Sequence, residues 1–95
     1  MAAYLVANMD VTDPVAYDNY RKGVGATVEQ YGGRFLVRGG AVEVLEGQLQ
    51  PKRVVILEFE SAQRLKDWWD SPEYRPLREL RQRASTGDLF LAHGV

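Results

Sequence analysis

The fold of this chain is decided by residues 31–40, which read Tyr-Gly-Gly-Arg-Phe-Leu-Val-Arg-Gly-Gly. Two glycine pairs bracket a short alternating run, a pattern typical of a β-strand with a turn at each end. Regular alternation puts Phe35 and Val37 on one face and, on the other, Arg34, Leu36 and Arg38. Arginines inside a sheet need water or an anion opposite them. The sequence therefore predicts that this strand carries the candidate site.

Two other segments have apolar residues on both strand faces. Residues 3–11 alternate, with Leu5 and Met9 on one face and Val6 on the other. Residues 53–59, Arg-Val-Val-Ile-Leu-Glu-Phe, are mostly β-branched or apolar. Strands of this kind are covered on both faces and belong inside a sheet.

Two shorter segments alternate less strongly. The alternation over residues 41–46 predicts an extended arm, which pairs either at a sheet edge or with a second subunit. Residues 89–93 predict a last short strand, after a stop signal at Ser85-Thr86-Gly87.

A long helix is predicted to begin at Asp13-Pro14. The Asp13 carboxylate can accept hydrogen bonds from the first-turn amides, and proline suits the first helical position. Large side chains then recur at steps of three and four, which places them along one face: Tyr17, Tyr20, Val24, Val28 and Tyr31. Gly23 and Gly25 interrupt this helix, so either it kinks there or another element approaches its backbone closely.

A second, broken helix is predicted after residue 60. Ser61 can cap a short segment that carries Trp68 and Trp69, and Ser71-Pro72 restarts it. The restarted segment places several residues at helical spacing: Tyr74, Leu77, Leu80, Arg81 and Ala84.

The resulting order, β-α-β-β-α-β, predicts an α+β fold of the ferredoxin-like kind. We expect one domain, residues 1–95, with a four-stranded antiparallel sheet and both helices on one face. The strands are apolar on both sides, so the other face would expose a large apolar patch in a monomer. A homodimer through the sheet faces covers it; a flat, half-hydrated sheet is the alternative.

Composition excludes several classes of function. Lys and Arg number 12 against 13 Asp and Glu, a net charge of -1 that argues against a general nucleic-acid binder. With no cysteine and one histidine, His93, we expect no metal site and no cofactor. No apolar run is long enough to cross a membrane, and the N-terminus does not resemble a signal peptide. The expected location is the cytoplasm.

An ordered set of motifs carries a family resemblance. These motifs are Asp13-Pro14 with Tyr17 and Tyr20, residues 31–40, Glu46-Gly47, Trp68, and Ser71-Pro-Glu-Tyr74 with Arg81. The chain resembles the small bacterial family of domains of unknown function 1330. That resemblance implies membership of the dimeric α+β barrel superfamily, which includes cofactor-free monooxygenases, isomerase-like and polyketide-processing enzymes, and ligand-sensing modules. The family has no established reaction, so the resemblance implies no catalytic residue.

The candidate ligand-binding residues lie where the strand at 34–38 passes beneath the first helix and the aromatic break. They are Tyr17, Tyr20, Arg34, Arg38, Trp68, Tyr74 and Arg81. Arg34 and Arg38 can hold a carboxylate or enolate, or can pair with Glu58. The tyrosines can equally be packing residues with a hydrated hydroxyl, and Ser71 is foremost a helix cap.

Two classes of function remain. One is a non-catalytic dimeric module that binds a small acidic or enolisable organic molecule between helices and sheet, or binds another protein. The other is a cofactor-independent enzyme of the monooxygenase, isomerase or polyketide-processing type, with arginines stabilising an oxyanion. The absence of an obligatory catalytic constellation favours binding.

Overall fold

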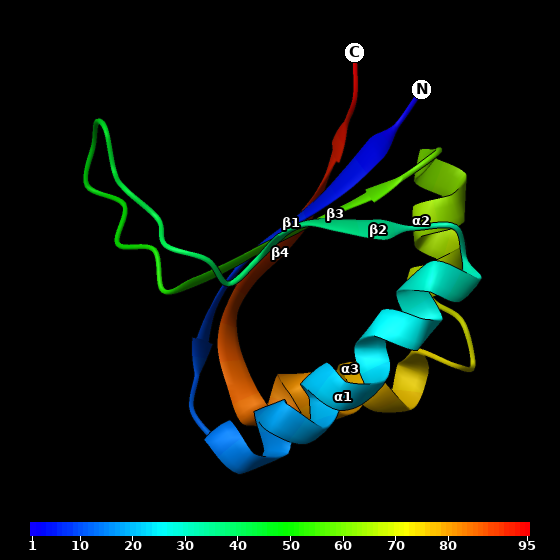
Figure 1. The fold of residues 1–95 in the computed structure, drawn as a ribbon, viewed down its shortest axis with the longest axis horizontal. Helices are drawn as coiled ribbons and strands as arrows, with labels where there is room; N and C mark the ends of the chain where they lie inside the picture. Colours follow the sequence, from blue (N-terminus) through cyan, green and yellow to red (C-terminus); the bar gives the residue numbers. More distant parts are fainter.

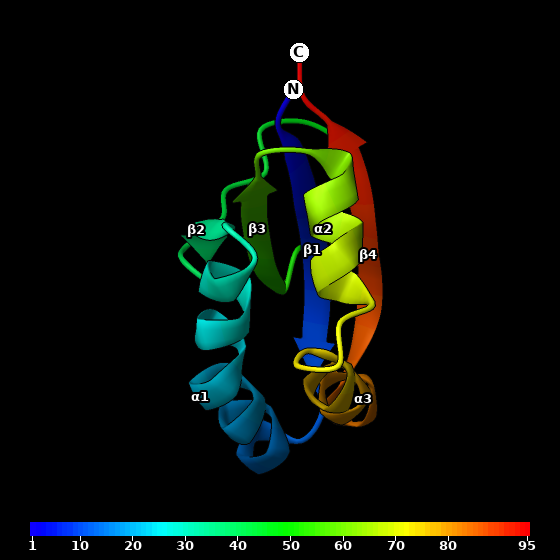
Figure 2. The same cartoon turned by 90° about the vertical axis from the view of Figure 1, so that its right-hand side faces the viewer.

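The computed structural model describes residues 1–95 as one sheet with helices on one of its faces (Figures 1 and 2). In chain order, the elements are β1 (Ala3–Val11), α1 (Pro14–Gln30), β2 (Arg34–Arg38), β3 (Arg53–Phe59), α2 (Ala62–Trp69), α3 (Arg75–Ala84) and β4 (Ser85–His93). The strand order is β2-β3-β1-β4, and every neighbouring pair is antiparallel. The predicted ferredoxin-like α+β fold is confirmed, with the second helix divided into α2 and α3.

The two central strands follow the predicted alternation. In β3, Val55, Leu57 and Phe59 are buried on the helix side, whereas Val54 and Ile56 are partly exposed on the other face. In β1 the helix-side residues are all buried: Ala3, Leu5, Ala7 and Met9. The core therefore lies between the sheet and the helices.

The predicted N-terminal cap of α1 acts as expected, and a glycine follows the other end of the helix. Asp13 Oδ1 accepts a hydrogen bond from the amide of Ala16 at 3.1 Å, and Gly32 ends the helix with a φ of +78°. A Cβ on Gly33 would lie 2.5 Å from the Phe59 ring, so only glycine allows β3 to pack this closely there. A Cβ on Gly23 would approach Leu77 to 3.2 Å, which shows that α3 lies close to the backbone of α1.

The break between α2 and α3 is built on Ser71. Its hydroxyl donates to the carbonyl of Trp68 at 2.7 Å and accepts from the amide of Tyr74 at 3.1 Å. These bonds satisfy groups at the end of one helix and the start of the next. Ser71 is therefore a capping residue, as the sequence indicates, although α3 itself begins at Arg75.

Strand β4 is longer than predicted. It begins at Ser85, directly after α3, whereas the sequence predicted a strand over residues 89–93. Pairing with β1 continues to Val11↔Ser85, and these ladder bonds outweigh the turn preference of Ser-Thr-Gly. A Cβ on Gly87 would clash with the carbonyl oxygen of Asn8, so glycine is required at this close strand contact.

Strand β2 contains a β-bulge that the sequence pattern does not reveal. Arg34 pairs with Glu58 and Phe35 with Leu57, but the register then shifts, so that Val37 pairs with Ile56 and Arg38 with Val55. Paired residues in a sheet point to the same face. Arg38 therefore shares the helix-side face with Phe35, and Arg34 lies on the opposite face. The prediction that Arg34 and Arg38 share a face is wrong, because a bulge adds one residue to the alternation.

Residues 41–50 form an exposed arm that projects away from the helices and the sheet (Figure 1). No strand forms within it, so the predicted pairing at an edge of the chain's own sheet is not observed. Apolar side chains are nevertheless exposed along the arm, notably Leu45 at 96% and Leu49 at 66%.

The sheet face opposite the helices has no covering element (Figure 1). Partly exposed apolar side chains from three strands share it, including Val6, Val54 and Ile56. Phe90 of β4 pairs with Val6 on this face and is 56% exposed. As for the helices, none has both the length and the apolar character that crossing a membrane requires.

Candidate functional site

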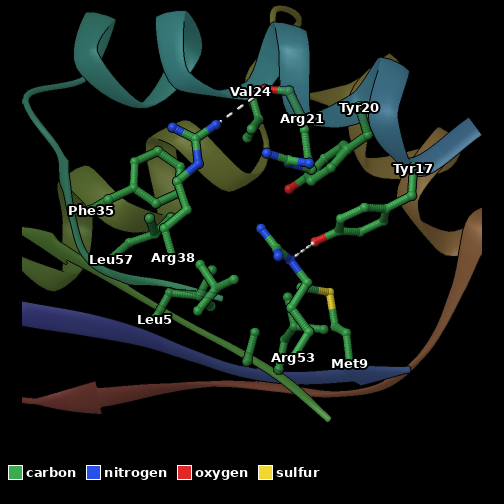
Figure 3. A pocket seen from close by; sticks show the side chains of 13 residues that line it. Leu5, Met9, Tyr17, Tyr20, Arg21, Val24, Phe35, Arg38, Arg53 and Leu57 are labelled. Atoms are coloured by element: carbon green, nitrogen blue, oxygen red, sulfur yellow. Dashed lines mark hydrogen bonds between the residues drawn. The ribbon is translucent and has the colours of Figure 1, made fainter. Parts of the chain in front are cut away.

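A pocket lies between α1 and the sheet, lined by 13 mostly apolar residues (Figure 3). Helix α1 contributes Tyr17 and Tyr20, the bulged strand β2 contributes Phe35 and Arg38, and β3 contributes Arg53. The enclosed volume is about 20 Å³. Because one water needs roughly 10–15 Å³ on this measure, the closed pocket has room for about one water molecule.

Two guanidinium groups in the pocket have no carboxylate partner. Arg38 Nη2 donates to the backbone carbonyl of Arg21 at 3.1 Å, and its guanidinium carbon lies 4.0 Å from the centre of the Phe35 ring. Arg53 Nε donates to the hydroxyl of Tyr17 at 3.0 Å. Neither arginine forms an ion pair; the salt bridges involve other cations. The pocket is therefore electropositive.

The third guanidinium is that of Arg21 on α1. It lies 3.5 Å from the carboxylate of Asp18, one helical turn earlier, and both side chains are half-exposed. An exposed pair at this spacing contributes little to stability and leaves the guanidinium free to move.

A buried polar chain leads from the pocket into the core. The hydroxyls of Tyr20 and Tyr74 lie 3.0 Å apart, and Arg81 Nε donates to the Tyr74 hydroxyl at 3.4 Å. The Tyr74 ring stacks on Trp68 with centroids 3.9 Å apart, and Trp68 Nε1 donates to Thr27 Oγ1 at 3.0 Å. Burial raises the pKa of Tyr20 well above its ordinary value, and the neighbouring Tyr74 adds to this effect. Tyr20 is therefore a neutral phenol at physiological pH.

Arg34 lies outside this site. It forms an ion pair with Glu58 at 2.7 Å on the sheet face opposite the helices. The sequence left two roles open for Arg34, binding an anionic ligand or pairing with Glu58. The structure shows the ion pair with Glu58.

The structure divides the predicted residues into three groups. Tyr17, Tyr20 and Arg38 line the pocket. Trp68, Tyr74 and Arg81 form the buried cluster beside it; the first two have no exposed surface, so Trp68 is a core residue rather than a pocket wall. Arg34 is the residue on the other face.

The pocket is also lined by Arg21 and Arg53, which were not among the residues predicted from the sequence. Arg53 has a signal in the sequence, because alternation from the buried Val55 and Leu57 places it on the same face. Arg21 has only a weak signal in the sequence. It follows Tyr20 directly and so lies at the edge of the helix face that carries the large side chains.

No group of three or more His, Cys, Asp or Glu side chains is arranged to hold a metal ion. The only histidine, His93, is exposed near the end of β4.

The topology and the helix-side pocket define this protein as a ferredoxin-like α+β protein. Solved structures with the same fold include a protein of unknown function from Rhodopseudomonas palustris, RPA0582, with a TM-score of 0.79 and 19% identity. That match covers 99% of this chain and 82% of the other. The chain belongs to the family described as Domain of unknown function (DUF1330), whose model matches residues 2–95.

A second structure of similar fold is SnoaB, a cofactor-independent oxygenase from Streptomyces nogalater. Its TM-score is 0.68 at 14% identity, and the match covers 99% of this chain and 93% of the other. At these identities the likeness concerns the fold alone. Among curated proteins, none matches the sequence significantly.

Proposed function

We propose that this protein binds a small organic acid, or the enolate of an enolisable molecule, in the pocket between α1 and the sheet. The observation that carries this proposal is the pair of guanidinium groups, Arg38 and Arg53, that lack a carboxylate partner beside apolar walls. Charge-assisted hydrogen bonds from guanidinium to an oxyanion are among the stronger polar contacts in proteins. An anion at this position supplies the missing partner.

The closed volume of about 20 Å³ is too small for an organic acid, so a lining side chain must move on binding, and Arg38 is the one we propose. The Arg38 side chain is exposed, and it is held by one backbone carbonyl and by the face of Phe35. Swinging it outward breaks no buried contact. The Phe35 ring that it uncovers then offers an apolar surface to the body of the ligand.

The test is a thermal-shift screen of small carboxylic acids and 1,3-dicarbonyl compounds, repeated on Arg38→Ala. For a ligand that stabilises the wild type, we expect Arg38→Ala to lose roughly 1.5–3 kcal/mol of binding free energy. Isothermal titration calorimetry measures this loss.

The matched control is Arg34→Ala, which removes an arginine from the same strand but from the opposite face. It should leave the affinity unchanged. Equal affinity for the wild type and Arg38→Ala, or a screen without any stabilising acid, would contradict the proposal.

The second candidate is a cofactor-independent oxygenase or a related enzyme. It is supported by the fold shared with a protein described as a cofactor-independent oxygenase. An oxygen electrode, used with each ligand that passes the binding screen, separates the two candidates. Steady oxygen consumption with a ligand favours the enzyme, whereas binding without turnover favours the binding module.

We also propose that the protein is a homodimer in which the open sheet faces pack together. The uncovered apolar residues of that face, Phe90 in particular, support this arrangement. In a two-fold symmetric dimer, the same face of both copies forms the interface, so each sheet covers the other.

A further inference from the structure

The polar side chains of the pocket are all hydrogen-bond donors or hydroxyls. Among the 13 lining residues, the polar groups are the guanidinium groups of Arg21, Arg38 and Arg53 and the hydroxyls of Tyr17 and Tyr20. No carboxylate, imidazole or amide side chain lines it. A guanidinium can donate but cannot accept, so the hydroxyls decide what the site offers a ligand.

The buried neighbours of Tyr20 favour one direction for its hydrogen bond to Tyr74. Tyr74 has no exposed surface, and its oxygen accepts from Arg81, which can only donate. The Tyr74 proton then needs an acceptor, because an unsatisfied buried donor is costly. The Tyr20 oxygen, 3.0 Å away, is the acceptor within reach. The bond can run either way, and with Tyr74 as the donor the proton left without a partner is that of Tyr20, which lines the pocket, and not that of the fully buried Tyr74.

The same logic applies to Tyr17. Its oxygen accepts from Arg53 Nε at 3.0 Å, and its own proton has no acceptor within the chain. Figure 3 shows the rings of Tyr17 and Tyr20 extending from α1 toward the arginines, with both hydroxyls directed into the space between helix and sheet. Two free hydroxyl protons therefore face one pocket.

We infer that the pocket is a donor-only site that selects ligands entering as an oxyanion, and that the anionic oxygen accepts hydrogen bonds from Tyr17 and Tyr20. The ligand class is carboxylate, phenolate or enolate. Arg81 and Tyr74 are positioning residues, because they act on the ligand through the hydroxyl of Tyr20. This inference rests on the proposed function and adds to it the atoms that hold the anion.

One consequence concerns protonation. Burial raises the pKa of Tyr20, so at neutral pH this residue keeps its proton and donates rather than acting as a base. No carboxylate or imidazole side chain lines the pocket to act as a base. Binding should therefore follow the ionisation of the ligand.

The probe for this inference is 4-nitrophenol, whose phenolate absorbs in the visible and which ionises near neutral pH. We expect the wild type to bind the phenolate in preference to the phenol, which lowers the apparent pKa of the bound probe. Nitrobenzene, which has no ionisable oxygen, measures the contribution of the apolar walls. An unchanged titration of the probe in the presence of excess wild-type protein would overturn the inference.

Two phenylalanine variants remove the donors singly. Tyr20→Phe and Tyr17→Phe should each weaken phenolate binding at least about tenfold, because each removes a hydrogen bond to a charged group. Neither should change the affinity for nitrobenzene. Tyr74→Phe should reduce the preference for phenolate by less than Tyr20→Phe, because it removes the donor behind Tyr20 and leaves the free hydroxyl.

The control is Tyr31→Phe, whose hydroxyl donates to Glu73 outside the pocket. It should retain the wild-type preference, and a loss equal to that of Tyr20→Phe would overturn the assignment. Phenolate binding that is lost in Arg38→Ala but kept in both tyrosine variants would refute the hydroxyl donors while leaving the proposed function intact. Failure of every acid in the thermal-shift screen would refute both.

Discussion

At the scale of single residues, the structure separates two arginines that the sequence places together. Arg38 lies over the Phe35 ring at the pocket, while Arg34 forms its ion pair with Glu58 on the opposite sheet face. The physical reason is the register shift between Phe35 and Val37. The sheet face that an arginine of β2 occupies therefore depends on whether it comes before or after the bulge in the chain.

The buried hydroxyl of Tyr20 should make stability fall at alkaline pH. Its pKa is raised in the folded state, so above about pH 10 the unfolded chain loses this proton first. The unfolded state then binds fewer protons than the folded state, and the free energy of unfolding decreases by up to about 1.4 kcal/mol per pH unit. Below pH 10 this group has no such effect.

Denaturant unfolding at pH 7 and pH 11 measures this decrease. The matched variant is Tyr20→Phe, which removes the titrating group and keeps the ring. It should lose less stability than the wild type between the two pH values. An equal loss in both proteins would mean that Tyr20 ionises in the folded state as easily as in the unfolded state.

At the scale of elements, β3 and α1 hold the pocket by different means. Strand β3 packs Val55, Leu57 and Phe59 into the core and carries Arg53 on the same face. Helix α1 is positioned by its cap at Asp13 and by the contact of Gly23 with Leu77. The pocket walls are thus regular elements, and its more exposed side, at Arg38, lies on the bulged edge strand.

The substitution Leu57→Ala tests the packing of β3. Leu57 is 2% exposed, so removing its side chain should cost about 2–5 kcal/mol of unfolding free energy, as cavity-forming changes do. Val15→Ala on α1, where the side chain is 76% exposed, should stay within about 0.5 kcal/mol. Chemical denaturation compares the two variants; similar small changes in both would place Leu57 outside the core.

At the scale of the whole molecule, the helices cover only one face of the sheet, and the arm at residues 41–50 projects away from it (Figure 1). The uncovered face and the arm together expose several apolar side chains: Val42, Val44, Leu45, Leu49 and Phe90. Soluble monomers rarely expose large contiguous apolar patches. The proposed homodimer gives the sheet face a partner.

Light scattering at micromolar concentration tests the dimer. We expect a mass of about twice 10.7 kDa for the wild type. Phe90→Glu should shift the mass toward the monomer, because it buries a charge in the proposed interface. Val15→Glu, an exposed change on the helix side, should leave the mass unchanged. A wild-type monomer across this concentration range would refute the dimer.

The sequence by itself determined the order and type of the elements. The apolar pattern of residues 53–59 is a local signal, and it correctly places β3 inside the sheet. The caps at Asp13, Ser61 and Ser71 are local signals too, and each acts in the structure as expected. Local hydrogen bonds and side-chain periodicity do not depend on distant parts of the chain. The ferredoxin-like topology follows from that order.

The tertiary structure decided the composition of the site. The bulge in β2 exists only in the pairing with β3, so alternation alone sends Arg38 to the wrong face. The meeting of Tyr20 with Tyr74, 54 residues apart, likewise requires α1 and the α2–α3 segment to pack together. Such contacts depend on pairing register and helix packing, which are set by the whole core and not by any one segment.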